Sequence, residues 1–527
     1  MYCPVARQSV DHDYHGAMDV TSERLRARQA AGLAGLMALA TQVTLGVPES
    51  ATVTMPSLPA WPELPSPGVG DERPPRDSDD VGLGGRLALL RSDHLVRNSL
   101  YLMLSSGIQA ALGFAFWVVV ARLFSTDAVG VAGSLISAST MIALLSLLGL
   151  NTTLVRFLPS ARNFSELISA AFVVVTGCAA AGGLVYVFLM PVIAPRLRFL
   201  QHHLIFVLGF LFLSAAASLN LLTDSVFIAT RRAGYCALTD GVVGGLTKIA
   251  LCVVLAGSGA YGLYTASLGG IAVAAVASIG LITTMLRWRP SLRNLLASLR
   301  PLLKFSGANY VSNLFTLLPT AIVPLIVLDR LGAQPAAYYY VAFQMALLLY
   351  AAVYAVESSF LAEASQGDTD WRGIRRRSRR LAIILFVPSG IALAVAGRWV
   401  LLIFGSTYSD HGAGSLEFLA LAVIPIAAYN WALTVLRIAG RLRALVLSNA
   451  VYCIAICGSA WVLSTHGLTA LSAAWLIGSS IAAIVSTIAA SAASRSAARH
   501  RRLKGQAGQL RPPASGPRAE LRDSAAP

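Results

Sequence analysis

Apolar residues occur in long runs from residue 100 onward, and polar residues gather in the short segments between them. Each run has about the 20 residues that an α-helix needs to cross the ~30 Å hydrocarbon core of a bilayer. Backbone groups in lipid must be paired within their own segment, so these runs are expected to be helices and not open strands. The pattern therefore predicts an all-α polytopic membrane protein with twelve transmembrane helices, at residues 100–121, 128–150, 167–194, 204–228, 238–256, 261–285, 305–328, 337–362, 381–404, 416–436, 444–463 and 468–492.

The basic residues of the connections indicate which way the chain crosses the membrane. The connections after the second, fourth, sixth, eighth and tenth helices contain eighteen Lys and Arg residues, whereas the alternate connections contain five. Short loops rich in Lys and Arg stay on the cytoplasmic side. Both termini are therefore predicted to lie in the cytoplasm.

Residue types repeat along the chain at an offset of about 208 residues. Arg122 and Arg330, each at the end of a predicted helix, are 208 residues apart, and Asp240 and Asn449 are 209 apart. Because each half has an even number of spans, the halves are predicted to be parallel repeats about an axis along the membrane normal. The expected organisation is a disordered cytoplasmic N-terminal tail (1–92), an N-lobe with helices 1–6 (93–292), a C-lobe with helices 7–12 (293–495) and a disordered basic cytoplasmic tail (496–527).

The composition fits a membrane protein better than a soluble one. Hydrophobic residues make up 56% of the chain and charged residues 13%, whereas soluble domains have roughly 25% charged residues. The net charge of +16 is not arranged as a basic stripe with interleaved aromatic residues, so it indicates membrane topology and no nucleic-acid partner. Lysine occurs only at Lys248, Lys304 and Lys504, and this preference for arginine is typical of GC-rich bacterial genomes. The predicted location is the bacterial cytoplasmic membrane.

No pattern in the sequence indicates an enzyme, a cofactor or a metal site. The six cysteines show neither a disulfide framework nor zinc-ligand spacing, and Cys453 and Cys457, one helical turn apart, are interpreted as packing residues. No glycine-rich phosphate-binding motif occurs between a strand and a helix. The predicted outer connections are too short to hold a set of catalytic acids and bases. We therefore expect transport without catalysis.

Ionisable side chains inside the predicted spans are few, and each is a candidate for function. A charge at bilayer depth costs about 2.5–3.5 kcal/mol on insertion scales, so it should face a cavity, a partner or the headgroups. Lys248 lies near the middle of helix 5, with Asp240 two turns earlier on about the same face. Asp224 lies in the last turns of helix 4, and Glu357 near the inner end of helix 8. Interfacial charges or structural pairs, including a pair of Lys248 with Asp240, are the alternatives to a functional role.

Helix 7 has a polar stripe whose members are spaced four, three and four residues apart, which places them on one face. The stripe consists of Asn309, Asn313, Thr316 and Thr320. It either lines a wet cavity or joins neighbouring helices through hydrogen bonds. Pro319 and Pro324 in the same helix are expected to kink it, which would let the two lobes rock.

Three segments resemble those of a known protein family. They are Arg97–Leu100 at the start of helix 1, Ala121–Phe124 at its exit and Gly149–Pro159 at the end of helix 2. Over roughly residues 93–495 the chain resembles the lipid-linked oligosaccharide flippases (Wzx type) of the multidrug/oligosaccharidyl-lipid/polysaccharide exporter superfamily. Phe124 departs from the family, which usually has glycine there, as the second half does at Gly332.

The resemblance implies a transporter that flips an undecaprenyl-pyrophosphate-linked oligosaccharide to the outer leaflet for surface polysaccharide synthesis, by alternating access. It implies as partners the lipid-linked saccharide, membrane lipids and polysaccharide assembly proteins. Because pyrophosphate is anionic, cationic side chains suit its binding. The candidate substrate-binding residues are the cations Lys248, Arg156, Arg231 and Arg441, with Asn309, Asn313 and Thr316 of the polar stripe.

Two other functions remain open at this point. A cation-coupled multidrug exporter of the same superfamily would need carboxylates in the cavity of the first half, and Asp224 and Asp240 are the candidates for ion coupling. A membrane scaffold of a polysaccharide assembly complex would transport nothing. Accumulation of lipid-linked precursor inside the cell would separate a flippase from a scaffold.

Overall fold

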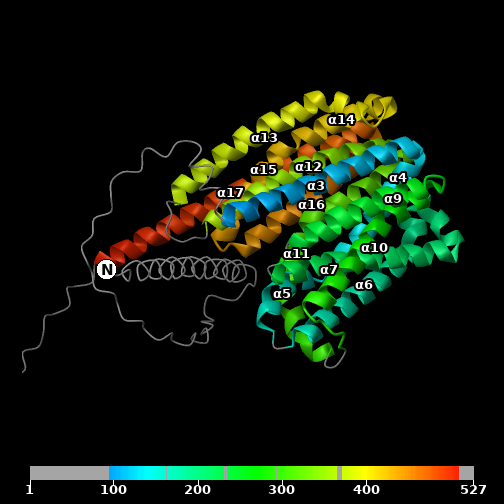
Figure 1. Ribbon diagram of the computed structural model, residues 1–527. Coiled ribbons are helices and arrows are strands. Elements are labelled where there is room, and N and C mark those ends of the chain that lie inside the picture. The colour runs from blue at the N-terminus through cyan, green and yellow to red at the C-terminus, as the bar shows by residue number, and fades with distance from the viewer. Residues whose placement is uncertain are drawn as a thin grey trace, which may run out of the picture.

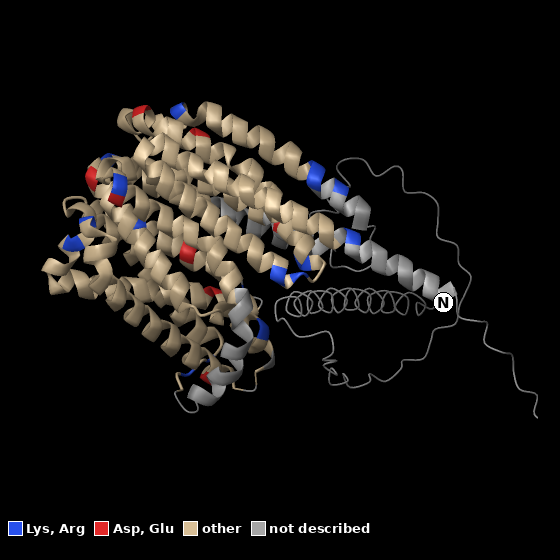
Figure 2. Ribbon diagram, turned by 180° about the vertical axis from the view of Figure 1, so that it is seen from behind, with Lys and Arg blue, Asp and Glu red and all other residues tan. Residues whose placement is uncertain are grey.

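The structure is a computed structural model, and it describes residues 94–161, 163–230, 232, 234–291, 295–364 and 371–509. The predicted N-terminal tail, residues 1–92, lies outside the described residues. The described chain is almost entirely helical and contains no β-strand. Charged residues lie mainly toward the ends of the helices, and uncharged residues form most of the middle of the bundle (Figure 2). This distribution is expected of helices that cross a membrane.

Eleven helical segments in the described part of the chain are long and apolar enough to cross a membrane. Nine are formed by α4 (Thr126–Ser146), α6 (Phe164–Ile193), α7 (Leu204–Ala229), α10 (Gly259–Met285), α11 (Leu295–Leu331), α12 (Ala333–Ala364), α13 (Trp371–Leu402), α16 (Leu442–Leu463) and α17 (Leu468–Gln509). The other two are composites, α8 (Gly234–Cys236) with η3 (Ala237–Gly244) and α9 (Gly245–Val254), and α14 (Ser406–Leu421) with α15 (Val423–Ile438). The shorter elements between them are α5 (Leu150–Phe157), η1 (Leu158–Ser160), η2 (Pro195–His202) and η4 (Ser464–His466).

The first predicted span lies within α3 (His94–Leu123), a continuous helix of 30 residues. Only its apolar part from Gln109 to Leu123 has described side chains. A membrane span in α3, which would bring the total to twelve, therefore stays a prediction. The inside position of both termini also stays a prediction from the arginine count. At the other end of the chain, α17 continues as a helix to Gln509, so the tail predicted from residue 496 begins as an extension of the last span.

The second predicted span ends earlier than its apolar run. We predicted residues 128–150, but α4 stops at Ser146 and the amphipathic helix α5 begins at Leu150. The break lies at Leu148 and Gly149, whose φ angles of 47° and 76° are left-handed. Glycine adopts this conformation without strain, and a single left-handed residue commonly ends a helix. Hydropathy could not reveal the break because Leu148 is as apolar as the helix before it.

Two other predicted spans also have different limits. Residues 405–415 were predicted as an outer connection, but α14 begins at Ser406 and continues into α15, because Tyr408 and Ser409 are buried despite the low hydropathy of the segment. Helix 5 begins at Gly234, and residues 237–244 within it form a π-helix. Insertions of this kind are frequent at functional sites, and this one contains Asp240.

The helices pack as two groups that correspond to the two halves of the chain. Figure 1 shows α13, α14, α15 and α17 on one side of the molecule and α6, α7 and α10 on the other. Most packing is within a half, and the halves meet chiefly where α4 contacts α11 and α12. The helix α11 packs against both groups, since it contacts α4, α5 and α6 as well as α12 and α16.

The two halves meet closely where α4 and α12 begin. A Cβ atom placed on Gly130 would overlap the carbonyl oxygen of Ala333 and lie 2.8 Å from the carbonyl carbon of Ala333. A Cβ atom placed on Gly133 would lie 2.8 Å from the Tyr340 ring. Small residues allow membrane helices to approach this closely. The Gln334 amide also donates across the junction to Asp127, at 3.3 Å. This end of the bundle is therefore closed between the lobes.

Candidate functional site

An acidic cluster lies in the first half, between α7 and η3. The Asn220 amide nitrogen donates to Oδ1 of Asp240 at 3.0 Å, and the carboxyl group of Asp224 lies beside that of Asp240. Oδ1 of Asp224 and Oδ1 of Asn220 are buried without a hydrogen-bond partner in the described structure. Adjacent carboxylates repel each other unless a proton or a cation lies between them. The cluster can therefore hold either one.

Lys248 lies in α9, two turns after Asp240. Its stem passes directly over Gly270 of α10, where an added Cβ would overlap Cγ of Lys248. Its ammonium group forms no hydrogen bond and no ion pair with any described residue, although the charge of Asp240 is near enough to act on it. Asp240 is instead engaged with Asn220 and Asp224. The structural pair of Lys248 with Asp240 is therefore not formed, and the cation is available for a ligand.

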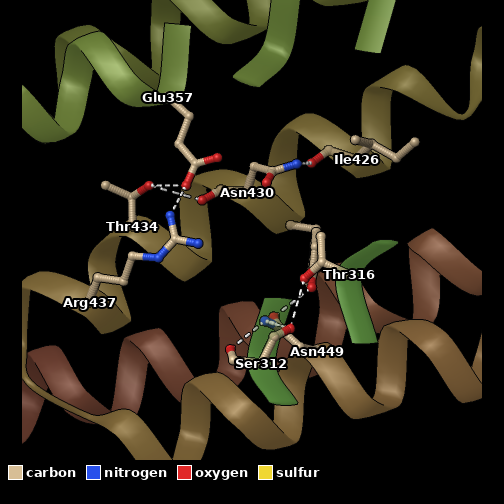
Figure 3. Close-up of polar contacts among 9 residues, drawn as sticks. Ser312, Thr316, Glu357, Ile426, Asn430, Thr434, Arg437 and Asn449 are labelled. Atoms are coloured by element: carbon tan, nitrogen blue, oxygen red, sulfur yellow. Dashed lines mark hydrogen bonds and ion pairs between the residues drawn. The ribbon is translucent and has the colours of Figure 1, made fainter. Parts of the chain in front are cut away.

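The polar contact of the first half recurs in the second half at the predicted offset. Asn220 and Asp240 correspond to Tyr429 and Asn449, each 209 residues farther on, and the Tyr429 hydroxyl donates to Oδ1 of Asn449 at 2.7 Å. The Asn449 amide nitrogen donates in turn to Ser312 of α11, at 2.8 Å to Oγ and 3.0 Å to the carbonyl oxygen (Figure 3). The contact is thus charged in the first half and neutral in the second.

A partly buried ion pair joins α12 to α15 in the second half. Oε1 of Glu357 accepts a hydrogen bond from Nη1 of Arg437 at 2.5 Å and another from the Thr434 hydroxyl at 2.9 Å (Figure 3). The Glu357 side chain is only 9% exposed, whereas that of Arg437 is 34% exposed. The sequence singled out Glu357 but counted Arg437 only as a topology signal. The pairing across 80 residues has no local signature, so sequence reasoning could not find it.

A small, open pocket of about 50 Å³ lies between the halves, away from the closed junction. Its polar lining groups are Asn151 of α5 and Tyr310 and Asn313 of α11, and its apolar wall is formed by Leu144, Leu147, Leu314 and Leu317. The Tyr310 hydroxyl donates to the Leu145 carbonyl oxygen at 2.6 Å. That carbonyl is in the last turn of α4, where helix carbonyls lack helical partners. The pocket therefore offers amide groups and a phenol, and no charged side chain is among its described lining residues.

The predicted substrate-binding residues are distributed over several elements. Asn313 lines the pocket between the halves, whereas the Thr316 hydroxyl donates within α11 to the Ser312 carbonyl at 3.2 Å and lies beside the Tyr429 hydroxyl. Arg156 is in α5, five residues after the pocket residue Asn151, and burial lowers the pKa of its guanidinium group. Arg441 of the same set is exposed at the start of α16. The side chain of Asn309 and the whole of Arg231 lie outside the described residues.

The stripe on α11 therefore divides into a pocket residue and an interhelical residue, and thiol labelling can test this. In a background without native cysteines, Asn313→Cys should react with a water-soluble thiol reagent faster than Thr316→Cys, because only Asn313 lines the pocket. Ala321→Cys is the matched control, since Ala321 in the same helix is 1% exposed. Equal protection of Asn313→Cys and Ala321→Cys would show that the pocket is dry.

The described architecture defines a class of protein. A bundle of membrane-spanning helices in two repeated halves, closed together at one end and enclosing a pocket toward the other, is that of a membrane transporter. Charged groups inside such a bundle mark substrate or ion pathways.

The chain belongs to the polysaccharide biosynthesis protein family, whose profile matches residues 119–413, more than half of its length. No curated protein matches the chain significantly. Among solved structures, it is similar to the lipid II flippase MurJ in an inward closed conformation, with a TM-score of 0.60 and 13% identity, covering 74% of this chain and 87% of that chain. A multidrug resistance MATE family transporter in an inward-facing conformation matches with a TM-score of 0.54 and 16% identity, covering 73% of this chain and 95% of that chain.

A Vibrio cholerae MATE transporter matches in the same way, with a TM-score of 0.51 and 15% identity, covering 74% of this chain and 94% of that chain. Identities this low show a shared fold. The fold and the family match together confirm the resemblance to the multidrug/oligosaccharidyl-lipid/polysaccharide exporter superfamily.

Proposed function

We propose that this protein flips a lipid-linked oligosaccharide, carried on undecaprenyl pyrophosphate, from the cytoplasmic to the outer leaflet of the bacterial cytoplasmic membrane. The observation that carries the proposal is the pocket between the halves, with Asn151, Tyr310 and Asn313 on its wall. Amide and phenol groups donate to and accept from hydroxyl groups, so they suit a neutral, polar sugar. The family match to polysaccharide biosynthesis supports the same substrate class.

The proposed mechanism is alternating access of the two lobes. The crossing of α4 with α12 keeps the lobes closed at one end while the pocket is accessible from the other. Helix α11 contacts both lobes and contains Pro319 and Pro324, which weaken its backbone hydrogen bonding and let it bend. Rocking about the α4–α12 junction would expose the pocket to the opposite leaflet.

The pyrophosphate needs cations along this path. Lys248 supplies one in the first half, and its ammonium group has no protein partner in the described structure. Arg156 follows the pocket residue Asn151 on α5. Arg231 and Arg441 are proposed to contribute at the mouth, where the arginine-rich connections would attract the anionic headgroup before it enters.

A cation-coupled multidrug exporter is the second candidate, and one observation favours it. The Asp224 and Asp240 carboxyl groups lie side by side within the first half and can hold a proton or a cation between them. The same pair would also serve a flippase as its ion-coupling site. The two functions therefore differ in the substrate that is moved and not in this cluster.

Deletion of the gene tests the proposal in the native bacterium. A flippase predicts loss of surface polysaccharide and accumulation of its lipid-linked precursor in the cytoplasmic leaflet. An exporter predicts drug sensitivity with intact polysaccharide. The double variant Asn151→Leu/Asn313→Leu, produced in the deletion strain at wild-type abundance, separates a flippase from a scaffold for polysaccharide assembly proteins. The variant should restore the polysaccharide if the protein is a scaffold and should fail to do so if it is a flippase. Normal precursor levels in the deletion strain would contradict the flippase.

A further inference from the structure

A narrow crevice of about 20 Å³, open to the surroundings at its mouth, lies in the second half, between α12, α13 and α15. Its wall is mostly apolar and is formed by Val353, Val356, Ala382, Phe386 and Ala427. Four polar side chains also line it, Glu357, Asn430, Trp431 and Thr434. The proposed transport path uses neither the crevice nor these residues.

The crevice has hydrogen-bond donors that no described protein group accepts. Nε1 of Trp431 is buried and has no hydrogen-bond partner in the described structure. Arg437, beside the crevice, uses Nη1 to bind Glu357, and its guanidinium group has five N–H donors in total. Glu357 therefore fixes the arginine in place and leaves most of its donors available. A ligand rich in acceptor oxygens would complete this arrangement.

A second arginine lies on the face of α13 that lines the crevice. Arg379 precedes Ala382 by three residues and Phe386 by seven, spacings that place all three on one face of the helix. Its side chain is exposed, and it lies toward the arginine-rich end of α13. Arg380, the next residue, is also exposed but points to a different face. Because Arg437 balances the charge of Glu357, Arg379 leaves this end of the crevice positively charged.

The surroundings of the crevice indicate a lipid. The next turns of α13 expose Ile383, Ile384 and Leu385 by 54%, 69% and 50%, as a lipid-facing surface does. We propose that the phosphate-bearing headgroup of an anionic membrane phospholipid binds at the mouth of this crevice, with Arg379 and Arg437 beside it and the Trp431 indole in its wall as donors. The acyl chains of the lipid would then continue along the exposed face of α13.

The composition of the site favours a resident lipid over the transported substrate. All the described residues that line the crevice belong to three helices of the second half. A transported headgroup must pass between the lobes, whereas a site built in one lobe moves with that lobe. The bound phospholipid would join the peripheral helix α13 to α12 and α15. This inference does not rest on the proposed flippase function.

Lipid binding to the purified full-length protein tests the proposal. Native mass spectrometry in detergent should show that phosphatidylglycerol binds more tightly than phosphatidylcholine. Arg379→Gln should weaken phosphatidylglycerol binding about fivefold, the effect expected for one basic contact to an anionic headgroup. Trp431→Phe removes one hydrogen-bond donor and should weaken it by a similar factor. Arg380→Gln is the matched control and should leave the affinity unchanged. Trp431→Phe keeps the ring that fills the site, so its effect would not come from unfolding.

Three results would overturn the proposal. The first is equal binding of phosphatidylglycerol and phosphatidylcholine, since the crevice would then not select charge. The second is a loss in Arg380→Gln as large as that in Arg379→Gln, which would indicate general surface electrostatics. The third is displacement of phosphatidylglycerol by a polyisoprenyl diphosphate at equal concentration, which would assign the crevice to the transported substrate.

Discussion

Replacing Lys248 with glutamine is expected to reduce polysaccharide export at least about tenfold, because a hydrogen bond to a charged group contributes about 1.5–3 kcal/mol. The variant should insert and accumulate normally. Asp240 is already bonded to Asn220, and Lys248 forms no ion pair in the described part of the chain, so the substitution leaves no acid newly unpaired. Lys248→Arg should keep part of the activity, since a single cation contacting phosphate acts chiefly through its charge.

The measurement is surface polysaccharide normalised to the membrane abundance of each variant. Arg443→Gln is a control for the loss of a positive charge, because Arg443 is exposed at the start of α16. Wild-type export by Lys248→Gln at wild-type abundance would remove Lys248 from the substrate path. A fall in abundance alone would instead assign it a structural role beside Asp240.

Replacing Gly130 with alanine is expected to abolish most transport, although the change adds a single methyl group. The new Cβ would overlap the Ala333 carbonyl oxygen and lie 3.0 Å from the backbone nitrogen of Ala337. Backbone atoms cannot rotate aside as a side chain can, so α4 and α12 would have to separate. The lobes could then no longer close at this end, and alternating access requires that closure.

Disulfide trapping can follow the same junction directly. Asp127→Cys and Gln334→Cys should crosslink readily, since these side chains are in hydrogen-bond contact, and Gly130→Ala should lower the yield. Gly177→Ala in α6 is the matched control, because a Cβ there meets nothing within 4 Å. Replacing a glycine inside a helix without a clash stabilises the helix by about 0.5–1 kcal/mol. Unchanged export and crosslinking in Gly130→Ala would show that the junction still closes around the added methyl group, which would contradict the prediction.

The sequence was sufficient to predict the helices but not their interruptions. Runs of about 20 apolar residues are a direct consequence of bilayer thickness, so the spans could be located from hydropathy alone. The end of α4 depends on the left-handed backbone at Leu148 and Gly149, and a hydropathy window averages over such a detail. The start of α14 was missed for the opposite reason, because Tyr408 and Ser409 are buried although their segment is polar.

The candidate site was predictable only where one residue was unusual by itself. Lys248, Asp224 and Asp240 are conspicuous in apolar spans, and the offset of about 208 residues drew attention to Asn449 as the counterpart of Asp240. The contacts of Asp240 with Asn220 and of Asn449 with Tyr429 depend on how two helices face each other, and sequence spacing does not specify that. Trp431 gave no signal, because its importance comes from an indole N–H left unpartnered by packing.

The glycine junction between α4 and α12 also bears on how this protein can evolve. Only 17% of the residues in the apolar stretch of α13 are buried. Many apolar residues suit a lipid-facing position equally well, so substitutions there are close to neutral. At Gly130 the neighbouring backbone excludes every side chain. Lineages can therefore exchange most of their membrane-facing residues while a few small ones stay fixed. Divergence of this kind allows one fold to persist in proteins that share as little as 13% of their residues.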